Sequence, residues 1–192
     1  MNIDLKNPAE NYKETILHQL DKMLLAAEKI EPFKKIDFEI LQTDKVDLEV
    51  LKLKNVIYLI NIADFGKNLN QLSFCKRIKT IKETQKKIKL PKVNFENCEN
   101  ENTVLYVGKS SGSFSNRIKQ HFGKGSKTTY SLQMDSWVMY PELCNLKLEL
   151  YYTSIDFEKL DIQEPDEQSQ LIELLETALH INYKPLLGRT GH

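Results

Sequence analysis

Cysteine is scarce in this sequence, and long apolar runs are missing from it. Three cysteines are spread over 192 residues, too far apart for a disulfide framework or a zinc motif. No apolar run reaches the length needed to cross a bilayer. Residues 1–13 are polar and mixed in charge, which is not typical of a signal peptide. The sequence therefore predicts a soluble cytoplasmic protein with reduced thiols and no membrane partner.

An excess of either charge is also missing, because 27 Lys and Arg balance 27 Asp and Glu. The distribution along the chain is uneven. Residues 74–92 hold eight basic residues and one acidic residue, whereas residues 149–176 hold nine acidic residues and one lysine. The neutral total therefore conceals basic segments that are suited to phosphate contacts. Solvated helix faces are the ordinary alternative for such clusters.

The chain has the size and composition of one globular domain, with 41% hydrophobic and 28% charged residues. Residues 56–62 and 103–107 are apolar and rich in β-branched side chains, and residues 146–152 alternate with charge, so we expect three strands. A further short strand at 36–41 and a short helix near Thr43 are less clear. The expected division is an N-terminal helical extension, 1–54, and a core domain, 55–192.

Helical periodicity accounts for most of the remaining chain. The first helix is expected to end near Lys29, with an apolar stripe of Ile16, Leu20, Met23, Leu24 and Ala27. An insert, 64–102, carries an amphipathic helix with Phe74, Ile78, Ile81 and Ile88 on one face. A helix capped by Ser113 and ended by Gly123 should bury Phe114, Ile118 and Phe122. The last helix begins at Pro165 and should bury Leu171, Leu175, Ala178 and Leu179.

The chemically informative residues fall in four short motifs. Val56-Ile57-Tyr58 lies in the first strand, and Tyr106-Val107-Gly108-Lys109 ends the second. Arg117 and His121 lie four residues apart on one helix, and Glu176 lies within residues 175–185 near the C-terminus. In this order and on these elements, the motifs resemble the GIY-YIG nuclease domain. The resemblance covers residues 55–190 and implies an α/β (α+β) fold with a small three-stranded antiparallel sheet flanked by helices.

Hydrolysis of a phosphodiester needs an aligned water, a base, cationic stabilisation and help for the leaving oxygen. The resemblance implies six catalytic residues, which are Tyr58, Tyr106, Lys109, Arg117, His121 and Glu176. One tyrosine, with Tyr58 preferred, would accept the water's proton, provided that nearby cations lower its pKa from about 10. Lys109 would lower that pKa or contact phosphate, and Arg117 would hold the phosphate. Glu176 would bind Mg²⁺ or Mn²⁺.

Two departures from the family pattern bear on activity. The first motif begins with Val56 instead of glycine, although its tyrosine is kept. The asparagine usual twelve residues after the glutamate is here Gly188, for which Arg189 or the nearby backbone is a candidate substitute. The leading hypothesis is a metal-dependent DNA endonuclease, with restriction or phage defence as a role suggested by analogy. The alternative is a catalytically inactive module that binds nucleic acid or protein.

DNA is the expected partner, RNA is the less favoured substrate, and a homodimer is left open. The residues expected to bind nucleic acid are basic and belong to the insert or to the loop after Gly123: Lys76, Arg77, Lys79, Lys82, Lys86, Lys87, Lys124 and Lys127. Trp137 is either a base-stacking residue or, by preference, a core residue. Glu173, Glu176 and His180 share a helix face, for which solvation is preferred over a transition-metal site.

Overall fold

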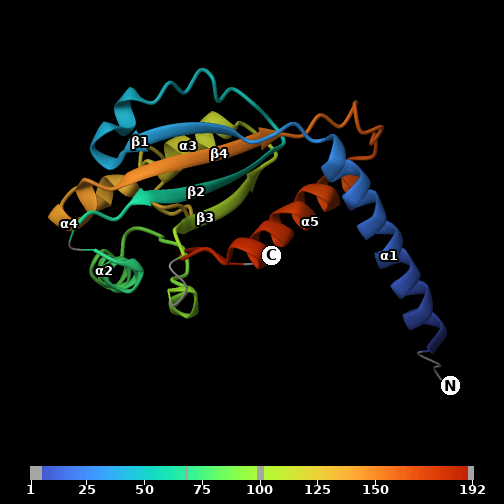
Figure 1. Cartoon of the computed structure of the whole chain (residues 1–192), viewed down its shortest axis with the longest axis horizontal. Coiled ribbons are helices and arrows are strands. Elements are labelled where there is room, and N and C mark those ends of the chain that lie inside the picture. Colours follow the sequence, from blue (N-terminus) through green and yellow to red (C-terminus); the bar gives the residue numbers. More distant parts are fainter. Residues whose placement is uncertain (1–5, 68, 99–101, 190–192) are drawn as a thin grey trace.

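A four-stranded antiparallel sheet forms the centre of the computed structural model, which describes residues 6–67, 69–98 and 102–189 (Figure 1). The strands run β1-β4-β2-β3 across the sheet. Their bounds are β1 (Lys34–Glu39), β2 (Val56–Asp64), β3 (Val104–Ser110) and β4 (Lys147–Ser154). The mixed fold class and the three expected strands are confirmed. Gly108 and Lys109 lie within β3, beyond the end that the sequence predicts for this strand.

The expected sheet of three strands is wrong, because β1 adds a fourth. It pairs with β4 along its whole length, from Lys34 opposite Tyr152 to Glu39 opposite Lys147. Phe38 is the one buried side chain of this strand, and most of the other residues are charged. Such charges are normal on an edge strand, where they discourage pairing with other chains. A 3₁₀ helix, Ile40–Lys45, follows β1 at the position where the short helix was expected.

Three of the four expected helices follow their predicted boundaries, the helix of the insert ends before Ile88, and the short helix at Pro141–Cys144 was not predicted. The helices are α1 (Lys6–Lys29), α2 (Gln71–Thr84), α3 (Phe114–His121), α4 (Pro141–Cys144) and α5 (Pro165–Tyr183), with short 3₁₀ helices at Phe95–Asn97 and Met134–Trp137. The Ser113 hydroxyl accepts a hydrogen bond from the Asn116 N–H at 3.3 Å, which confirms the cap of α3. None of the helices in the described ranges is long and apolar enough to cross a membrane.

The sheet separates two apolar clusters. Successive side chains of a strand point to opposite faces, so Tyr58 and Ile60 join a large cluster with α2 and α3, while Ile57 joins a smaller cluster with α5. Phe114, Ile118 and Phe122 are buried as predicted. In the insert, of which residues 68 and 99–101 lie outside the described part, α2 buries Phe74, Ile78 and Ile81, whereas Ile88 follows the helix and is only partly buried.

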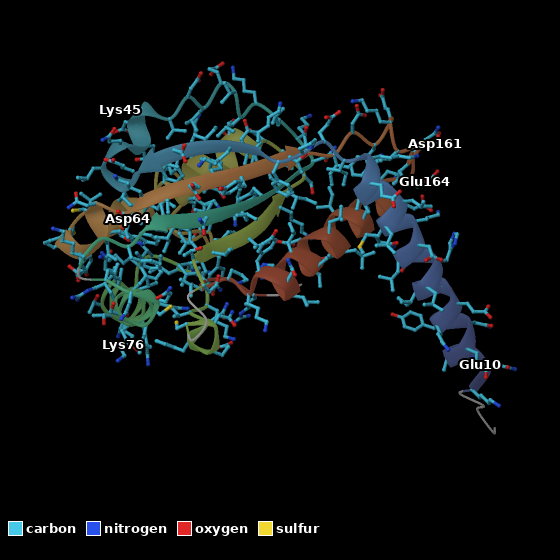
Figure 2. The ribbon with its side chains drawn as sticks, in the orientation of Figure 1. Glu10, Lys45, Asp64, Lys76, Asp161 and Glu164 are labelled. Carbon is cyan, nitrogen blue, oxygen red and sulfur yellow. The ribbon has the colours of Figure 1, made fainter. Side chains whose placement is uncertain are left out.

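Only part of the expected apolar stripe of α1 is covered, because Met23 packs against the smaller cluster and Ile16 is partly buried. Leu20 and Leu24 are 36% and 60% exposed, whereas Ala26 is buried. Helix α1 meets α5 near one end and extends past the sheet, with Glu10 toward its far end (Figures 1 and 2). Polar contacts mark the face it turns to α5, including Gln19 to Gln170 at 2.9 Å. The periodicity identified the helix correctly but only part of the side that α5 covers.

Trp137 belongs to the core, as the preferred interpretation held. Its side chain is 0% exposed, and its ring meets the edge of Phe74 with centroids 5.7 Å apart. A buried indole is not available to stack on a base, so the alternative role for Trp137 is wrong. The aromatic residue that is exposed in this region is Tyr130.

Gly123→Ala is expected to lower the free energy of unfolding by about 1–3 kcal/mol, since Gly123 has φ of +88° and a Cβ would lie 1.9 Å from Asp135 Oδ1. Asp135 would have to leave its ion pair with Lys127. The control is Gly112→Ala, where a Cβ meets nothing within 4 Å, and its effect should stay within about 0.5 kcal/mol. Urea unfolding of both variants measures this. Equal stability of the two would contradict the analysis.

Candidate active site

Two tyrosines face each other across the pair of strands β2 and β3. Tyr58 lies opposite Gly108, and Tyr106 lies opposite Ile60, so both tyrosines point to the face that α3 covers. Their rings stack with centroids 6.2 Å apart. A Cβ on Gly108 would lie 2.6 Å from the Tyr58 hydroxyl oxygen and 2.7 Å from the Tyr106 ring. Glycine at 108 is therefore what allows the two phenols to approach.

Arg117 of α3 joins the two hydroxyl groups. Its Nε donates to Tyr58 Oη and its Nη2 to Tyr106 Oη, each at 3.1 Å. Nη1 donates to Gln120 Oε1 at 3.1 Å and to the carbonyl of Tyr130 at 3.2 Å. All four acceptors are neutral, so these hydrogen bonds orient the guanidinium without neutralising its charge. Such a cation suits a phosphate, whose oxygens match the planar fork.

His121 lies one helical turn beyond Arg117 and is fully buried. Its Nε2 is 2.8 Å from Tyr58 Oη, and its Nδ1 accepts a hydrogen bond from the Leu132 N–H at 3.2 Å. Because Nδ1 is an acceptor, the proton of the neutral ring is assigned to Nε2, which then donates to Tyr58. Burial, followed by the charge of Arg117, lowers the pKa of His121 well below its usual value, so the ring is neutral near neutral pH.

Burial dominates the ionisation of both tyrosines. It raises the pKa of Tyr58 and of Tyr106, and the charge of Arg117 opposes this shift only in part. Both phenols are therefore protonated in the resting protein. Nevertheless, Tyr58 Oη receives two donated hydrogen bonds, from Arg117 and from His121, and such bonds favour a phenolate when it forms.

The carboxylates approach from the other face of the sheet. Lys109 lies opposite Ile57 and so points toward α5. Its ammonium is 3.1 Å from Glu173 Oε1 and 3.5 Å from Glu176 Oε2. The Glu176 side chain is only 15% exposed, compared with 41% for Glu173. Since Tyr106 and Lys109 leave β3 on opposite faces, the site wraps around this edge strand.

A cavity of about 350 Å³ connects the two halves of the site. Five cationic residues and one carboxylate contribute to its wall, which consists of Lys82, Pro91, Lys92, Tyr106, Lys109, Arg117, Tyr130, Glu176, Gly188 and Arg189. Tyr58 and His121 are 0% exposed and lie behind Arg117 and Tyr106. The structure thus brings together all six residues that the sequence predicts for catalysis, and places four of them at the cavity surface.

The position of the missing asparagine is shaped for glycine. Gly188 has φ of +119°, and a Cβ there would lie 3.4 Å from the His180 ring and 3.5 Å from the Tyr106 ring. A side-chain amide reaches this turn from elsewhere, because the Nδ2 of buried Asn94 donates to the carbonyls of Pro185 and Gly188 at 3.0 and 3.2 Å. The insert therefore fastens the C-terminal turn that carries Arg189.

The basic residues expected to bind nucleic acid are spread over more than one surface. Lys82 lines the cavity, and its Nζ donates to the carbonyl of Pro91 at 3.1 Å. Arg77 is ion-paired with Glu142 and lies over the Tyr140 ring. Several of the others lie on the outer side of α2 or are paired with acidic residues: Lys76 (Figure 2), Lys79 with Glu83, Lys124 with Asp44 and Lys127 with Asp135. A role in binding nucleic acid remains a prediction for all eight residues: Lys76, Arg77, Lys79, Lys82, Lys86, Lys87, Lys124 and Lys127.

Sequence reasoning missed Lys92 and Tyr130 as parts of the cavity wall. Lys92 follows α2 and Tyr130 follows α3, in irregular segments where no periodicity predicts the direction of a side chain. The helix face of Glu173, Glu176 and His180 is less solvated than the sequence predicts, because the Glu176 side chain is 15% exposed and His180 is buried. The glutamates bind Lys109, and His180 is 6% exposed beneath Gly188. The described ranges contain no cluster of three or more His, Cys, Asp or Glu suited to a metal ion.

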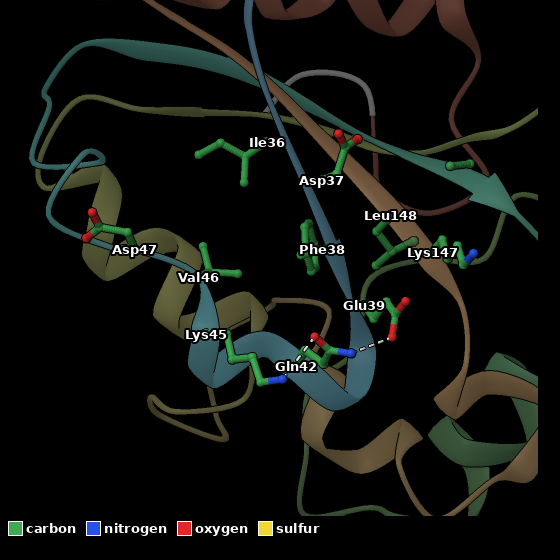
Figure 3. Close-up of a pocket in the computed structure, with 11 residues that line it drawn as sticks. Ile36, Asp37, Phe38, Glu39, Gln42, Lys45, Val46, Asp47, Lys147 and Leu148 are labelled. Atoms are coloured by element: carbon green, nitrogen blue, oxygen red, sulfur yellow. Dashed lines mark hydrogen bonds between the residues drawn. The ribbon is translucent and has the colours of Figure 1, made fainter.

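A second cavity, of about 450 Å³, lies at the opposite edge of the sheet (Figure 3). It is formed by β1, the following 3₁₀ helix and β4, and none of the six predicted catalytic residues lines it. Gln42 bridges two of its charged groups, donating to Glu39 at 2.8 Å and accepting from Lys45 at 3.3 Å (Figure 3). Its charges are thus partly satisfied within the cavity wall, unlike the charge of Arg117.

The fold and the cation-rich site define a nuclease-type catalytic domain. The sequence model described as the GIY-YIG catalytic domain matches residues 57–187, and the chain belongs to this family. A search of curated proteins and a search of solved structures each found no match. The family assignment agrees with the motifs around Tyr58, Tyr106 and Glu176.

The free energy of unfolding is expected to fall as the pH falls below about 6.5, because the unfolded chain then protonates His121 while the folded protein does not. The pKa of His121 is lowered by burial. Its contribution to the free energy of unfolding is therefore complete above the pKa that this histidine has in the unfolded chain. The pKa of His180 is also lowered. The free energy of unfolding therefore still depends on pH when His121 is replaced. His121→Gln should reduce the slope by up to about 1.4 kcal/mol per pH unit. The control is His18→Gln at an exposed position of α1, and an unchanged slope in His121→Gln would contradict the prediction. Urea unfolding between about pH 5 and pH 7 provides the measurement.

Proposed function

We propose that this protein is a metal-dependent endonuclease that hydrolyses phosphodiester bonds in DNA. The observation that carries the proposal is the cavity wall, in which five cations surround one carboxylate and three of the four catalytic motifs meet. A polyanion supplies the charge that such a wall lacks. A restriction or phage-defence role and a cytoplasmic location rest on the sequence alone, and a homodimer would supply a second active site for the opposite strand.

Arg117 is proposed to bind the scissile phosphate and to stabilise the charge that develops on it. Tyr106 reaches the cavity surface, whereas Tyr58 is fully buried. Tyr106 is therefore better placed to meet the attacking water, although Tyr58 was preferred on sequence grounds. Tyr58 would then act through Arg117, and His121 would orient Tyr58 through its Nε2 proton. Lys109 contributes positive charge between β3 and α5.

Glu176 is the residue proposed to hold Mg²⁺ or Mn²⁺. Its carboxylate lines the cavity and is 15% exposed, and oxygen ligands suit these ions. One carboxylate is enough when water and substrate phosphate supply the other ligands, as is common for Mg²⁺. Such an ion would help the leaving oxygen by neutralising its charge. Lys109 is 3.5 Å from Glu176, so this ion pair loosens when Glu176 binds a cation.

A binding module without catalysis is the second candidate, and Gly188 in place of asparagine is the observation that favours it. The amide of Asn94 bonds to the Gly188 carbonyl at 3.2 Å. This contact supports an active site in which the insert supplies the amide. An inactive module would bind DNA equally well in EDTA and would show no turnover with either metal ion.

Glu176→Gln is expected to reduce nicking of supercoiled plasmid DNA by about 100-fold or more, while DNA binding in a gel shift is retained. The control is Glu167→Gln, the same change on the same helix, where the carboxylate pairs with Lys22. The assay is run with Mg²⁺, with Mn²⁺ and with EDTA, and duplex RNA is tested in parallel. Wild-type rates in Glu176→Gln would rule out the metal-ligand assignment. Binding without turnover in the wild type would favour the inactive module, and cleavage of RNA alone would reassign the substrate.

The cleavage rate is expected to rise with pH, by about tenfold per unit between about pH 7 and pH 9. The reason is that burial raises the pKa of Tyr106, so the phenolate fraction grows over this whole range. Tyr106→Phe should be slow and should lose the slope, whereas Tyr58→Phe should be slower than the wild type but keep it. Single-turnover rates at saturating metal measure this. A slope that persists in Tyr106→Phe and disappears in Tyr58→Phe would return the role of base to Tyr58.

A further inference from the structure

Tyr130 is an exposed aromatic residue at the rim of the catalytic cavity. It contributes to the same wall as Arg117 and Glu176, and it is 61% exposed. The other large aromatic residues near the site differ from it, because Tyr58 and Trp137 are 0% exposed. Most of this ring is open to solvent, so its accessible surface is a candidate contact for substrate.

The backbone around Tyr130 is fixed by the catalytic residues themselves. Its carbonyl accepts a hydrogen bond from Arg117 Nη1 at 3.2 Å. Two residues later, the Leu132 N–H donates to His121 Nδ1 at 3.2 Å. Between them, the buried Ser131 hydroxyl donates to the carbonyl of Gln120 at 2.9 Å. These bonds hold the backbone that carries the ring. A ligand that stacks on the ring therefore binds with a small entropy cost for ordering the loop.

Positive charge surrounds the ring. The ammonium of Lys89 is 5.4 Å from the ring centroid, and the Lys89 backbone bonds to the same loop, with its carbonyl accepting from the Ser131 N–H at 3.4 Å. Lys82 and Lys92 line the cavity beside it. An aromatic platform flanked by cations is the combination that binds single-stranded nucleic acid, because bases stack while phosphates meet the charges.

We propose that Tyr130 stacks on an unpaired base beside the scissile phosphate, and that the enzyme therefore acts where a DNA strand is single or a nucleotide has left the helix. This inference rests on the proposed function and extends that function by naming the form of the DNA substrate. The hydrogen bond from Arg117 places the Tyr130 backbone next to the residue that would hold the phosphate. Within a duplex both faces of a base are covered by its neighbours, so the ring reaches only a base that is unstacked.

The test uses the full chain and DNA oligonucleotides that carry one 2-aminopurine, whose fluorescence changes on stacking. The same sequence is presented as a single strand, as a perfect duplex and as a duplex in which the 2-aminopurine is unpaired. Binding is measured in EDTA, and cleavage is measured with Mg²⁺ or Mn²⁺. The variants are Tyr130→Ala and Tyr130→Phe. The matched control is Tyr12→Ala, because Tyr12 is similarly exposed, at 68%, but lies on α1.

The wild type should bind and cleave the single strand and the unpaired duplex better than the perfect duplex. Tyr130→Ala should weaken binding to the two unpaired forms by roughly 10- to 100-fold and abolish the fluorescence change. Tyr130→Phe keeps the ring and should behave as the wild type, as should Tyr12→Ala. Melting curves of the variants confirm that the exposed substitution leaves the fold intact.

Three results would overturn the inference. If Tyr130→Ala binds the unpaired forms as tightly as the wild type, the stacking platform is wrong while the nuclease proposal stands. If it weakens the perfect duplex equally, the ring supports the site instead of stacking on a base. If the wild type neither binds nor cleaves any of the three substrates, the proposed function fails and this inference fails with it.

Discussion

A partly buried guanidinium that shares its hydrogen bonds between two tyrosines is the interaction on which the rest of this site depends. A charged group removed from water must be compensated, and the acceptors that hold Arg117 are neutral oxygens of Tyr58, Tyr106, Gln120 and Tyr130. They fix its direction without cancelling its charge. The glycine at 108, the cap of α3 and the burial of the tyrosines all serve to create this geometry. In the proposed function, the phosphate of the substrate is the anion that completes the charge balance.

The edge strand β3 decides how the two halves of the site meet. Alternation along a strand sends Tyr106 toward α3 and Lys109 toward α5, so the phenols and the carboxylates approach from opposite faces and can share a cavity only at an edge. The C-terminal turn closes that edge, since the N–H groups of Leu186 and Leu187 donate to the carbonyls of Val104 and Leu105 at 2.9 Å. A central strand would have kept the two groups apart.

The predicted part of this structure is the part carried by strong local patterns. The strands with Tyr58 and Tyr106 and the cap at Ser113 follow from β-branched runs and from capping chemistry, and the order of the motifs then selects the site. The strand at 34–39 was uncertain because a charged edge strand buries few side chains. Lys92 and Tyr130 were missed because loops have no period, and their direction depends on long-range bonds, such as that from Arg117 to the Tyr130 carbonyl. Tertiary contacts also decided which side of α1 meets α5.

Arg117 cannot keep all four of its present hydrogen bonds and also bind a phosphate through two N–H groups. A guanidinium has five N–H groups, and four hydrogen bonds already engage it, so a bidentate phosphate displaces at least one present acceptor. Loss of an Arg117 bond removes an interaction that opposes the rise in pKa of the tyrosine concerned. Support for a phenolate must then come from hydrogen-bond donors that the phosphate does not engage. His121 is such a donor, because its bond to Tyr58 is buried and independent of the cavity. A neutral histidine whose Nε2 proton is fixed by the Leu132 N–H would therefore keep Tyr58 oriented when Arg117 binds a phosphate as proposed.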